Sequence, residues 1–387
     1  MIKNGFNSSS VLSKGNLKID NFKEKKKIEN NENKIKADTK NSETIFNDIN
    51  NLKKYLKENC KEFDEKFELL EQLKSGSAGS VFLGKLRKIN SKQIAFKFLF
   101  NENLKEKREK KTNEKSKKDY NKHIEISIHG TLKNKHIPEV YGYYPIQNSS
   151  CIAMEYNKYG DLENFKRKIL KRSSLSETLV LYIGGGLLEA LYYLHSKNKI
   201  IHMDIKQQNV LVDDFLNIKL TDFSVSVNYK SAKQYINLPM VGTCYYMSPE
   251  VLAKKQILVS EASKIDIYSL GVLLYLLAFY DYPYALNDVS SKDYTQIAKN
   301  IETKTLEFPK DTGHSKILIN FLKKCLNKDI NQRYNIYDAM NDPFFKGYQI
   351  ILDEKEKIYN AGSFLINLMV DNLNKLNDYI KEQEKKL

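Results

Sequence analysis

The chain has 387 residues, of which 41% are hydrophobic, so it is long enough to bury a substantial core. Lysine and arginine total 63 against 48 acidic residues, a formal charge of +15. Because this excess is spread through solvated Lys/Glu/Asn runs, it argues against nucleic acid as the main partner. No segment reaches the roughly 20 apolar residues that span a bilayer, and the start of the chain is polar. We therefore expect an intracellular protein of the cytoplasm or nucleus.

The four cysteines lie far apart, at Cys60, Cys151, Cys244 and Cys325. This spacing argues against a metal cluster and against the disulfide framework of a small secreted protein. A reducing compartment is predicted.

Changes in composition divide the chain into three parts. Residues 1–62 form a low-complexity extension rich in Lys and Asn, which we expect to be mostly disordered because it can bury little apolar surface. A folded domain is expected over residues 63–346, with a basic Lys/Glu-rich insertion at 101–122. Residues 347–387 are expected to be a helical tail.

Two apolar patterns outside the domain have helical spacing. The first lies in the extension, at Ile45, Ile49, Leu52 and Leu56. The second lies in the tail, at Ile366, Met369, Leu373, Leu376 and Ile380. Two heptads are too few for a coiled coil, so packing of the tail against the domain is favoured. A regulatory partner that binds the tail helix or the basic insertion is the alternative.

The order of elements within the domain predicts its architecture. Strand-like runs at 67–73, 81–86 and 94–98 read as an antiparallel meander. Helical patterns follow at 175–195, interrupted by three glycines, and then at 264–279 and 316–326. The apolar run within 270–280 is short and bounded by acids, which favours a buried core helix. The fold class is therefore α+β, with a small sheet before a larger, mainly helical body.

Two polar features lie on the predicted sheet. The turn Ser75-Gly76-Ser77-Ala78-Gly79-Ser80-Val81 would let backbone N–H groups approach a phosphate, although many glycine turns only reverse the chain. Lys97 ends an apolar strand, where a buried ammonium requires an anion. Glu125, on a predicted helix above the sheet, is the best candidate carboxylate, and a phosphate oxygen is the alternative.

The most informative segment covers residues 200–212, where polar residues alternate with apolar anchors. It holds Asp204, Lys206 and Asn209 in what must be a rigid loop. Asp222 follows 18 residues after Asp204, again at the end of an apolar strand. Mg²⁺ prefers oxygen ligands and takes few of them from protein. Two carboxylates and an Asn in this arrangement predict a magnesium-phosphate site.

These motifs, in this order from about residue 67 to 345, resemble the eukaryotic protein kinase superfamily. The resemblance implies a bilobal fold with ATP and Mg²⁺ between the lobes, and transfer of the ATP γ-phosphoryl group to protein substrates. It makes Asp204 the catalytic base, and Asn209 and Asp222 the magnesium ligands. It also implies that Lys97 holds the α and β phosphates and that Glu125 positions Lys97.

The resemblance also assigns the nucleotide pocket. Met154 would be the gatekeeper, Glu155 and Asn157 would belong to the hinge, and Asp161 could hold the ribose or a basic residue of the substrate. The full set that it places against the nucleotide is Leu73, Gly76, Ser77, Gly79, Val81, Ala95, Lys97, Met154, Glu155, Asn157, Asp161, Leu211 and Asp222.

Two residues point to the serine/threonine branch of the family. Lys206, two positions after the base, would neutralise charge on the transferring phosphoryl group, and Thr243 resembles the threonine that such kinases place against that lysine. The resemblance further implies that Glu250 pairs with Arg333 and that Asp266 anchors the catalytic loop.

Among the departures from the family pattern, three bear on activity. Lys74 replaces the first glycine of the turn and adds a cation, and Ser224 replaces the glycine after Asp222-Phe223. Met203 replaces an arginine that commonly grips a phosphate on the activation loop, so we predict weak dependence on phosphorylation of that loop. The phosphorylation candidates are Ser226, Ser231 and Tyr235. A catalytically impaired kinase-fold scaffold is the alternative function, but retention of the catalytic residues favours an active enzyme.

Overall fold

The computed structural model of this chain describes most of the region after residue 47. The described residues are 48–76, 79–88, 92–100, 125–146, 149–172, 174–310, 313–358, 360–369 and 373–386. The disorder expected before residue 48 and the basic insertion expected at residues 101–122 lie outside these ranges.

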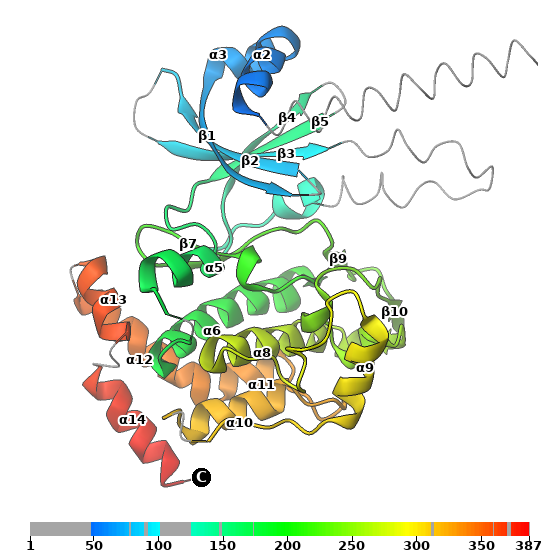
Figure 1. The fold of residues 1–387 in the computed structure, drawn as a ribbon, viewed down its shortest axis with the longest axis vertical. Helices are drawn as coiled ribbons and strands as arrows, with labels where there is room; N and C mark the ends of the chain where they lie inside the picture. The colour runs from blue at the N-terminus through cyan, green and yellow to red at the C-terminus, as the bar shows by residue number, and fades with distance from the viewer. Residues whose placement is uncertain are drawn as a thin grey trace, which may run out of the picture.

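Five antiparallel strands form the smaller, N-terminal lobe (Figure 1). In chain order they are β1 (Phe67–Gly76), β2 (Gly79–Leu86), β3 (Gln93–Phe100), β4 (Val140–Ile146) and β5 (Ser149–Glu155). Their spatial order is β1-β2-β3-β5-β4, so the predicted meander is confirmed and extended by two strands. The register sets Lys97 of the middle strand between Val81 of β2 and Ile152 of β5.

Two helices, α2 (Ile49–Asn59) and α3 (Lys61–Lys66), pack against this sheet. Their buried residues Leu52, Leu56 and Phe63 belong to the same apolar cluster as the phenylalanines of β1, β2 and β3. These side chains share the core of the sheet, so the folded unit includes α2 and begins before residue 63. The start expected from the sequence was residue 63.

The larger lobe is mainly helical (Figure 1). Its helices are α5 (Leu162–Asn164), α6 (Glu177–Tyr192), α7 (Pro249–Leu252), α8 (Lys264–Phe279), α9 (Tyr294–Thr303), α10 (Lys316–Cys325), α11 (Ile336–Asn341), α12 (Pro343–Lys357), α13 (Ala361–Met369) and α14 (Asn374–Glu384). Three two-stranded ladders lie among them: β6 (Ile200–Ile201) with β9 (Val227–Asn228), β7 (Val210–Val212) with β8 (Ile218–Leu220), and β10 (Tyr235–Asn237) with β11 (Gln256–Leu258).

Helix α8 is the centre of the larger lobe. The stretch Val259–Phe279 is long and apolar enough to cross a membrane, but 94% of its most apolar window is buried inside the protein. A helix that is apolar all round and covered by its neighbours is a core helix, as the run at 270–280 predicted. No other helix among the described residues has that length and composition.

The three glycines that were expected to interrupt a helix lie within an unbroken α6. A Cβ at Gly185 would lie 2.0 Å from the side chain of Tyr348, and one at Gly184 would lie 2.6 Å from Phe344. Glycine costs a helix up to about 1 kcal/mol per residue. Here the missing side chains allow α12 to pack directly on α6. The glycine run therefore forms a helix–helix contact and does not interrupt the helix.

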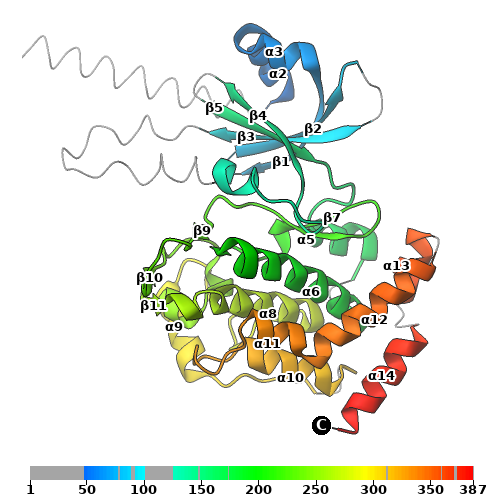
Figure 2. The same ribbon diagram turned by 180° about the vertical axis from the view of Figure 1, so that it is seen from behind.

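The C-terminal tail folds along the larger lobe as α12, α13 and α14 (Figure 2). Helix α12 begins at Pro343, so it crosses the boundary expected at residue 346 without interruption. Ser176 donates to the carbonyl of Leu368, and Glu384 accepts the N–H of Lys316. The buried apolar residues of the tail are Tyr348, Ile351, Phe364, Leu368, Leu373 and Leu376. The tail thus packs against the domain, as the apolar spacing favoured.

Candidate active site

Lys97 meets two carboxylates where the lobes face each other. Its Nζ lies 2.6 Å from Glu125 Oε1 and 3.0 Å from Asp222 Oδ1. Glu125 begins a helical turn over residues 125–129 and is 2% exposed. Burial disfavours the ammonium, but the charges of Asp222 and Glu125 outweigh it and raise the pKa of Lys97. The structure thus brings together the predicted lysine and carboxylate, with a second carboxylate beside them.

The residues around Asp222 are held in one packed arrangement. Burial opposes ionisation of Asp222, but the Lys97 ammonium outweighs it, and a hydrogen bond from Ser224 helps to keep the pKa of Asp222 below its ordinary value. Phe223 is fully buried, with its ring centroid 4.9 Å from that of His129 and 5.0 Å from that of His202. Burial also lowers the pKa of His129 to about 4, so this imidazole is neutral near pH 7.

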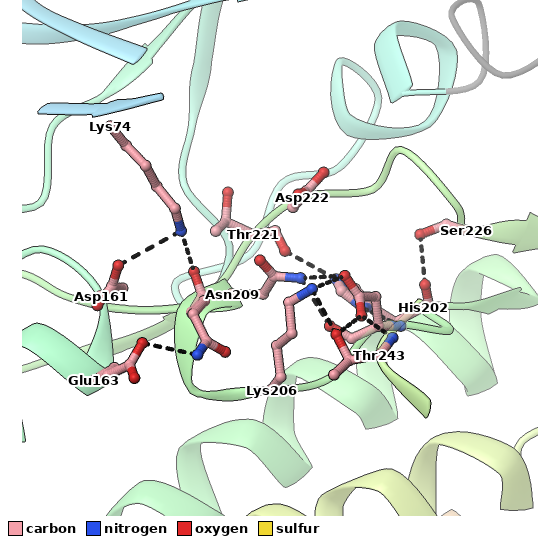
Figure 3. Close-up of polar contacts among 12 residues, drawn as sticks. Lys74, Asp161, Glu163, His202, Lys206, Asn209, Thr221, Asp222, Ser226 and Thr243 are labelled. Atoms are coloured by element: carbon pink, nitrogen blue, oxygen red, sulfur yellow. Dashed lines mark hydrogen bonds and ion pairs between the residues drawn. The ribbon is translucent and has the colours of Figure 1, made fainter. Parts of the chain in front are cut away.

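Lys206, Asn209 and Thr243, which Figure 3 labels, all hydrogen-bond to the carboxylate of Asp204. Lys206 Nζ is 2.6 Å from Asp204 Oδ2 and 3.0 Å from Thr243 Oγ1. The backbone N–H of Thr243 donates to Asp204 Oδ1 over 3.2 Å, and Asn209 Nδ2 donates to Asp204 Oδ2 over 2.8 Å. The loop of Asp204 and the segment of Thr243 are thereby fixed to each other.

A buried carboxylate of α8 holds the same loop from the side of the helical lobe. Asp266 is fully buried and accepts the N–H of His202 at 2.7 Å and of Met203 at 3.0 Å, and it lies 2.8 Å from His195 Nε2. Burial opposes its ionisation, but the contact with His195 and the loop N–H groups lower the pKa of Asp266. Met203 has a φ of +72°, which is strained for a residue other than glycine. The carboxylate stabilises this strained backbone.

A second buried ion pair joins Glu250 of α7 to Arg333. Arg333 Nη1 and Nη2 lie 2.6 and 3.0 Å from the two carboxylate oxygens of Glu250. The guanidinium also lies over the ring of Tyr268, 4.9 Å from its centroid. The implied pair of Glu250 and Arg333 is thus formed with two-point geometry.

The residues predicted to line the nucleotide pocket come from both lobes. Val81, Ala95 and Met154 lie in one apolar cluster of the sheet. Leu211, on β7 of the helical lobe, forms an isolated bridge with Asp161. The structure therefore places these residues on the two sides of the segment that joins the lobes.

That joining segment is fixed by polar contacts. Asn157 Nδ2 donates to the Glu155 carbonyl over 3.2 Å, and the Glu155 carboxylate lies 3.0 Å from Lys219 Nζ. Asp161 then begins α5 by accepting the N–H of Asn164 at 2.9 Å.

The glycine turn closes the hairpin of β1 and β2, with Gly76 opposite Gly79. A Cβ at Gly79 would lie 2.0 Å from the carbonyl oxygen of Phe98, so the strand pairing itself requires glycine there. Leu73, before the turn, is 40% exposed. Ser77 lies outside the described residues.

Asn209 and Asp222 can offer oxygens to a metal ion. The Nδ2 of Asn209 is directed to Asp204, which leaves its Oδ1 to accept, and Asp222 uses Oδ1 for Lys97 while keeping a second oxygen. Mg²⁺ takes oxygen ligands and commonly only one or two from protein side chains, so this set fits it. No group of three or more His, Cys, Asp or Glu suited to a metal occurs in the described part of the chain.

Two contacts at the site were not foreseen. Lys74 reaches from β1 to the helical lobe, where its Nζ lies 3.2 Å from the Gln208 carbonyl and 3.6 Å from Asp161 Oδ2 (Figure 3). Ser226, a candidate phosphorylation site, is 1% exposed and donates to the His202 carbonyl over 3.1 Å. Sequence spacing carries no signal for either contact, because each joins segments that meet only in the folded chain.

Comparison with known proteins agrees with this arrangement. The family described as protein kinase domain matches residues 67–345. The serine/threonine-protein kinase dst4 of Dictyostelium discoideum is 32% identical over 302 residues, which cover 77% of this chain and 58% of that protein. For the serine/threonine-protein kinase pakH of the same organism the identity is 30% over 285 residues, covering 72% and 50%. For the serine/threonine-protein kinase KIC1 of Saccharomyces cerevisiae it is 33% over 228 residues, covering 58% and 20%.

This chain belongs to the protein kinase family. Its five-stranded sheet followed by a mainly helical lobe is the bilobal fold expected from the sequence. The chain spans about half the length of the two Dictyostelium relatives.

Proposed function

We propose that this chain is an active serine/threonine protein kinase that transfers the γ-phosphoryl group of ATP to Ser and Thr hydroxyls of protein substrates. The group of Asp204, Lys206 and Thr243 carries the proposal, since its carboxylate, ammonium and hydroxyl lie within 3.4 Å of one another. The printed names of the relatives support the choice of acceptor. Because ATP and reduced thiols characterise the cell interior, we infer an intracellular setting.

Asp204 is the residue that orients the acceptor and takes its proton. As the bond from the acceptor oxygen to phosphorus forms and the bond to the leaving oxygen of ATP breaks, the hydroxyl proton passes to the Asp204 carboxylate. Lys206 lies beside that carboxylate and offers N–H groups to the charge on the phosphoryl oxygens. Thr243 keeps the Lys206 ammonium in place by accepting one of its hydrogen bonds.

The remaining residues bind the nucleotide. Lys97 holds the α and β phosphates, with Glu125 fixing the position of its ammonium. Oxygens of Asn209 and Asp222 hold Mg²⁺, which supplies charge neutralisation for the phosphate oxygens. The set proposed against adenine is Leu73, Ala95, Met154, Glu155, Asn157 and Leu211, with Gly76, Ser77, Gly79 and Val81 over the phosphates. Asp161 holds either the ribose or a basic residue of the substrate.

The alternative of an impaired kinase-fold scaffold rests on Lys74, Met203 and Ser224. None of these displaces a catalytic side chain: Met203 contributes its backbone N–H to Asp266, and Ser224 adds a hydrogen bond to Asp222. The Lys97 to Glu125 contact is formed. These contacts favour the active enzyme.

A labelled-ATP assay on a degenerate peptide library tests this function, with Asp204→Asn as the variant. We expect labelling to fall by about 10²–10⁴, the usual contribution of a positioned general base. Asp214→Asn, an exposed acid of the turn between β7 and β8, is the matched control and should label like the unmodified protein. Label on tyrosine alone would contradict the acceptor, and equal labelling by Asp204→Asn would refute the proposed catalysis.

A further inference from the structure

Lys74 forms a bridge between the two lobes at the edge of the site (Figure 3). It stands on β1, paired with Val81 of β2, and its side chain extends to the helical lobe. There it contacts the carbonyl of Gln208 at 3.2 Å and the carboxylate of Asp161 at 3.6 Å. The chain has this lysine where the family pattern has a glycine, and a glycine could make neither contact.

The two acceptors of Lys74 make a receptor for a cation next to the catalytic loop. Gln208 directly precedes Asn209, whose amide donates to Asp204, so the Gln208 carbonyl lies at the edge of the acceptor site. Asp161 is 7% exposed, and its Oδ1 is engaged by Asn164, which leaves Oδ2 to face Lys74.

A further carboxylate adds negative charge at this edge. Glu163 is exposed and accepts a hydrogen bond from Gln208 Nε2 over 2.8 Å. The edge is therefore acidic, and Lys74 is the cation that ion-pairs with Asp161 within the described residues.

The bridge is weak enough to be displaced. Half of the Lys74 side chain is exposed, and an exposed ion pair changes an equilibrium by about fivefold at most. An arginine or lysine of a bound protein substrate offers the same charge to the same carboxylate and carbonyl. Lys74 and such a residue cannot occupy the receptor together.

We propose that Lys74 is a specificity-determining residue, which occupies the acidic edge formed by Asp161 and the Gln208 carbonyl and so competes with basic side chains of the protein substrate. The inference rests on the proposed kinase activity and goes beyond it, because it states which acceptors the enzyme selects. With Lys74 in place, the kinase has no preference for an arginine close to the acceptor residue. Without Lys74, the same acidic edge favours peptides that carry such an arginine.

The test compares kcat/KM at saturating ATP for paired peptides that differ by one arginine or alanine, scanned over the positions flanking the acceptor. Lys74→Met keeps the length of the side chain and removes its charge, and Lys74→Gln is the second variant in case the first folds poorly. We expect the ratio of arginine to alanine peptides to be near one for the unmodified protein. It should rise about threefold to fivefold at one or more positions in both variants.

Two further variants separate this effect from others. Lys85→Met removes another lysine of the sheet, paired with Glu68 and away from the site, and should leave the ratio unchanged. Asp161→Asn combined with Lys74→Met should return the ratio to near one, because the receptor carboxylate is gone. Both peptides of a pair are measured with the same protein, so a change in ATP binding affects the two values of kcat/KM equally and leaves their ratio unchanged.

The outcomes distinguish this inference from the proposed function. An unchanged ratio in Lys74→Met and Lys74→Gln, with active enzyme, overturns the specificity role, and a change in KM for ATP alone would assign Lys74 to the nucleotide. A strong arginine preference already present in the unmodified protein also overturns it. Absence of labelling in every protein refutes the proposed function, and this inference with it.

Discussion

The buried pair of Arg333 and Glu250 gives the sharpest prediction on stability. Arg333 is 1% exposed and Glu250 6%, and the two meet through two hydrogen bonds. Arg333 also donates to the carbonyls of Asn327 at 2.9 Å and Lys264 at 3.2 Å. Arg333→Met removes all four hydrogen bonds while keeping an unbranched side chain over Tyr268.

The expected cost follows from what the variant leaves behind. A buried carboxylate without its partner costs about 3–5 kcal/mol. At roughly 2–4 °C per kcal/mol for a domain of this class, the midpoint of thermal unfolding should fall by roughly 6–20 °C. Arg333→Lys keeps the charge but cannot contact both carboxylate oxygens at once. Its unfolding midpoint should therefore lie between those of the unmodified protein and Arg333→Met.

Thermal and urea unfolding of Arg333→Met, Glu250→Gln and the double variant measure the effect. The double variant should lose about 2 kcal/mol less than the sum of the single ones, because the second change no longer strands a charge. A fall in the unfolding midpoint below about 3 °C, or strict additivity in the cycle, would refute the reasoning.

Three other predictions follow from the same contacts. His129 has an ordinary pKa of 6.5 and a folded value of about 4, so the unfolded chain binds its proton first. Stability should therefore fall by about 3 kcal/mol as pH drops from 6.5 to 4, and His129→Leu should flatten this dependence in urea titrations. Truncation after Gly347 removes apolar side chains that are at most 3% exposed, each contributing about 1.5–3 kcal/mol, so the shortened protein should unfold or aggregate. The control Ile366→Ser changes a position that is 61% exposed and should leave the unfolding midpoint unchanged. Because β10 and β11 pair the loop that follows Asp222 with the chain beyond Glu250, Ser231→Ala, Tyr235→Phe or phosphatase treatment should change kcat by less than about tenfold. Abolished activity would contradict the role given to Met203.

The catalytic loop illustrates what sequence spacing can fix. Asn209 and Asp222 are separated by two short strands, β7 and β8, which pair as a hairpin, and Asp204 lies five residues before Asn209. With so few residues between them, local geometry alone brings their side chains to one place. The alternation of apolar strands with polar loops was therefore enough to predict this loop.

The extent of the core was harder to predict. Leu52 and Leu56 had the spacing of a helix, but spacing does not say which surface covers the apolar stripe, and the domain start was placed too late. The glycines of α6 looked like a break because their partner, Tyr348, lies far along the chain. Both errors concern contacts that depend on the packing of whole elements.

By itself, the sequence determined the family and the order of the lobes and predicted the residues around the phosphate, because these depend on local patterns and short spacings. Only the tertiary structure decided which distant groups meet where no family motif names the pair. Lys74 reaches Gln208 across 134 residues, and Ser176 reaches Leu368 across 192. The physical reason is that such contacts are set by how the helices and the sheet pack, and each requires partners that no local pattern identifies.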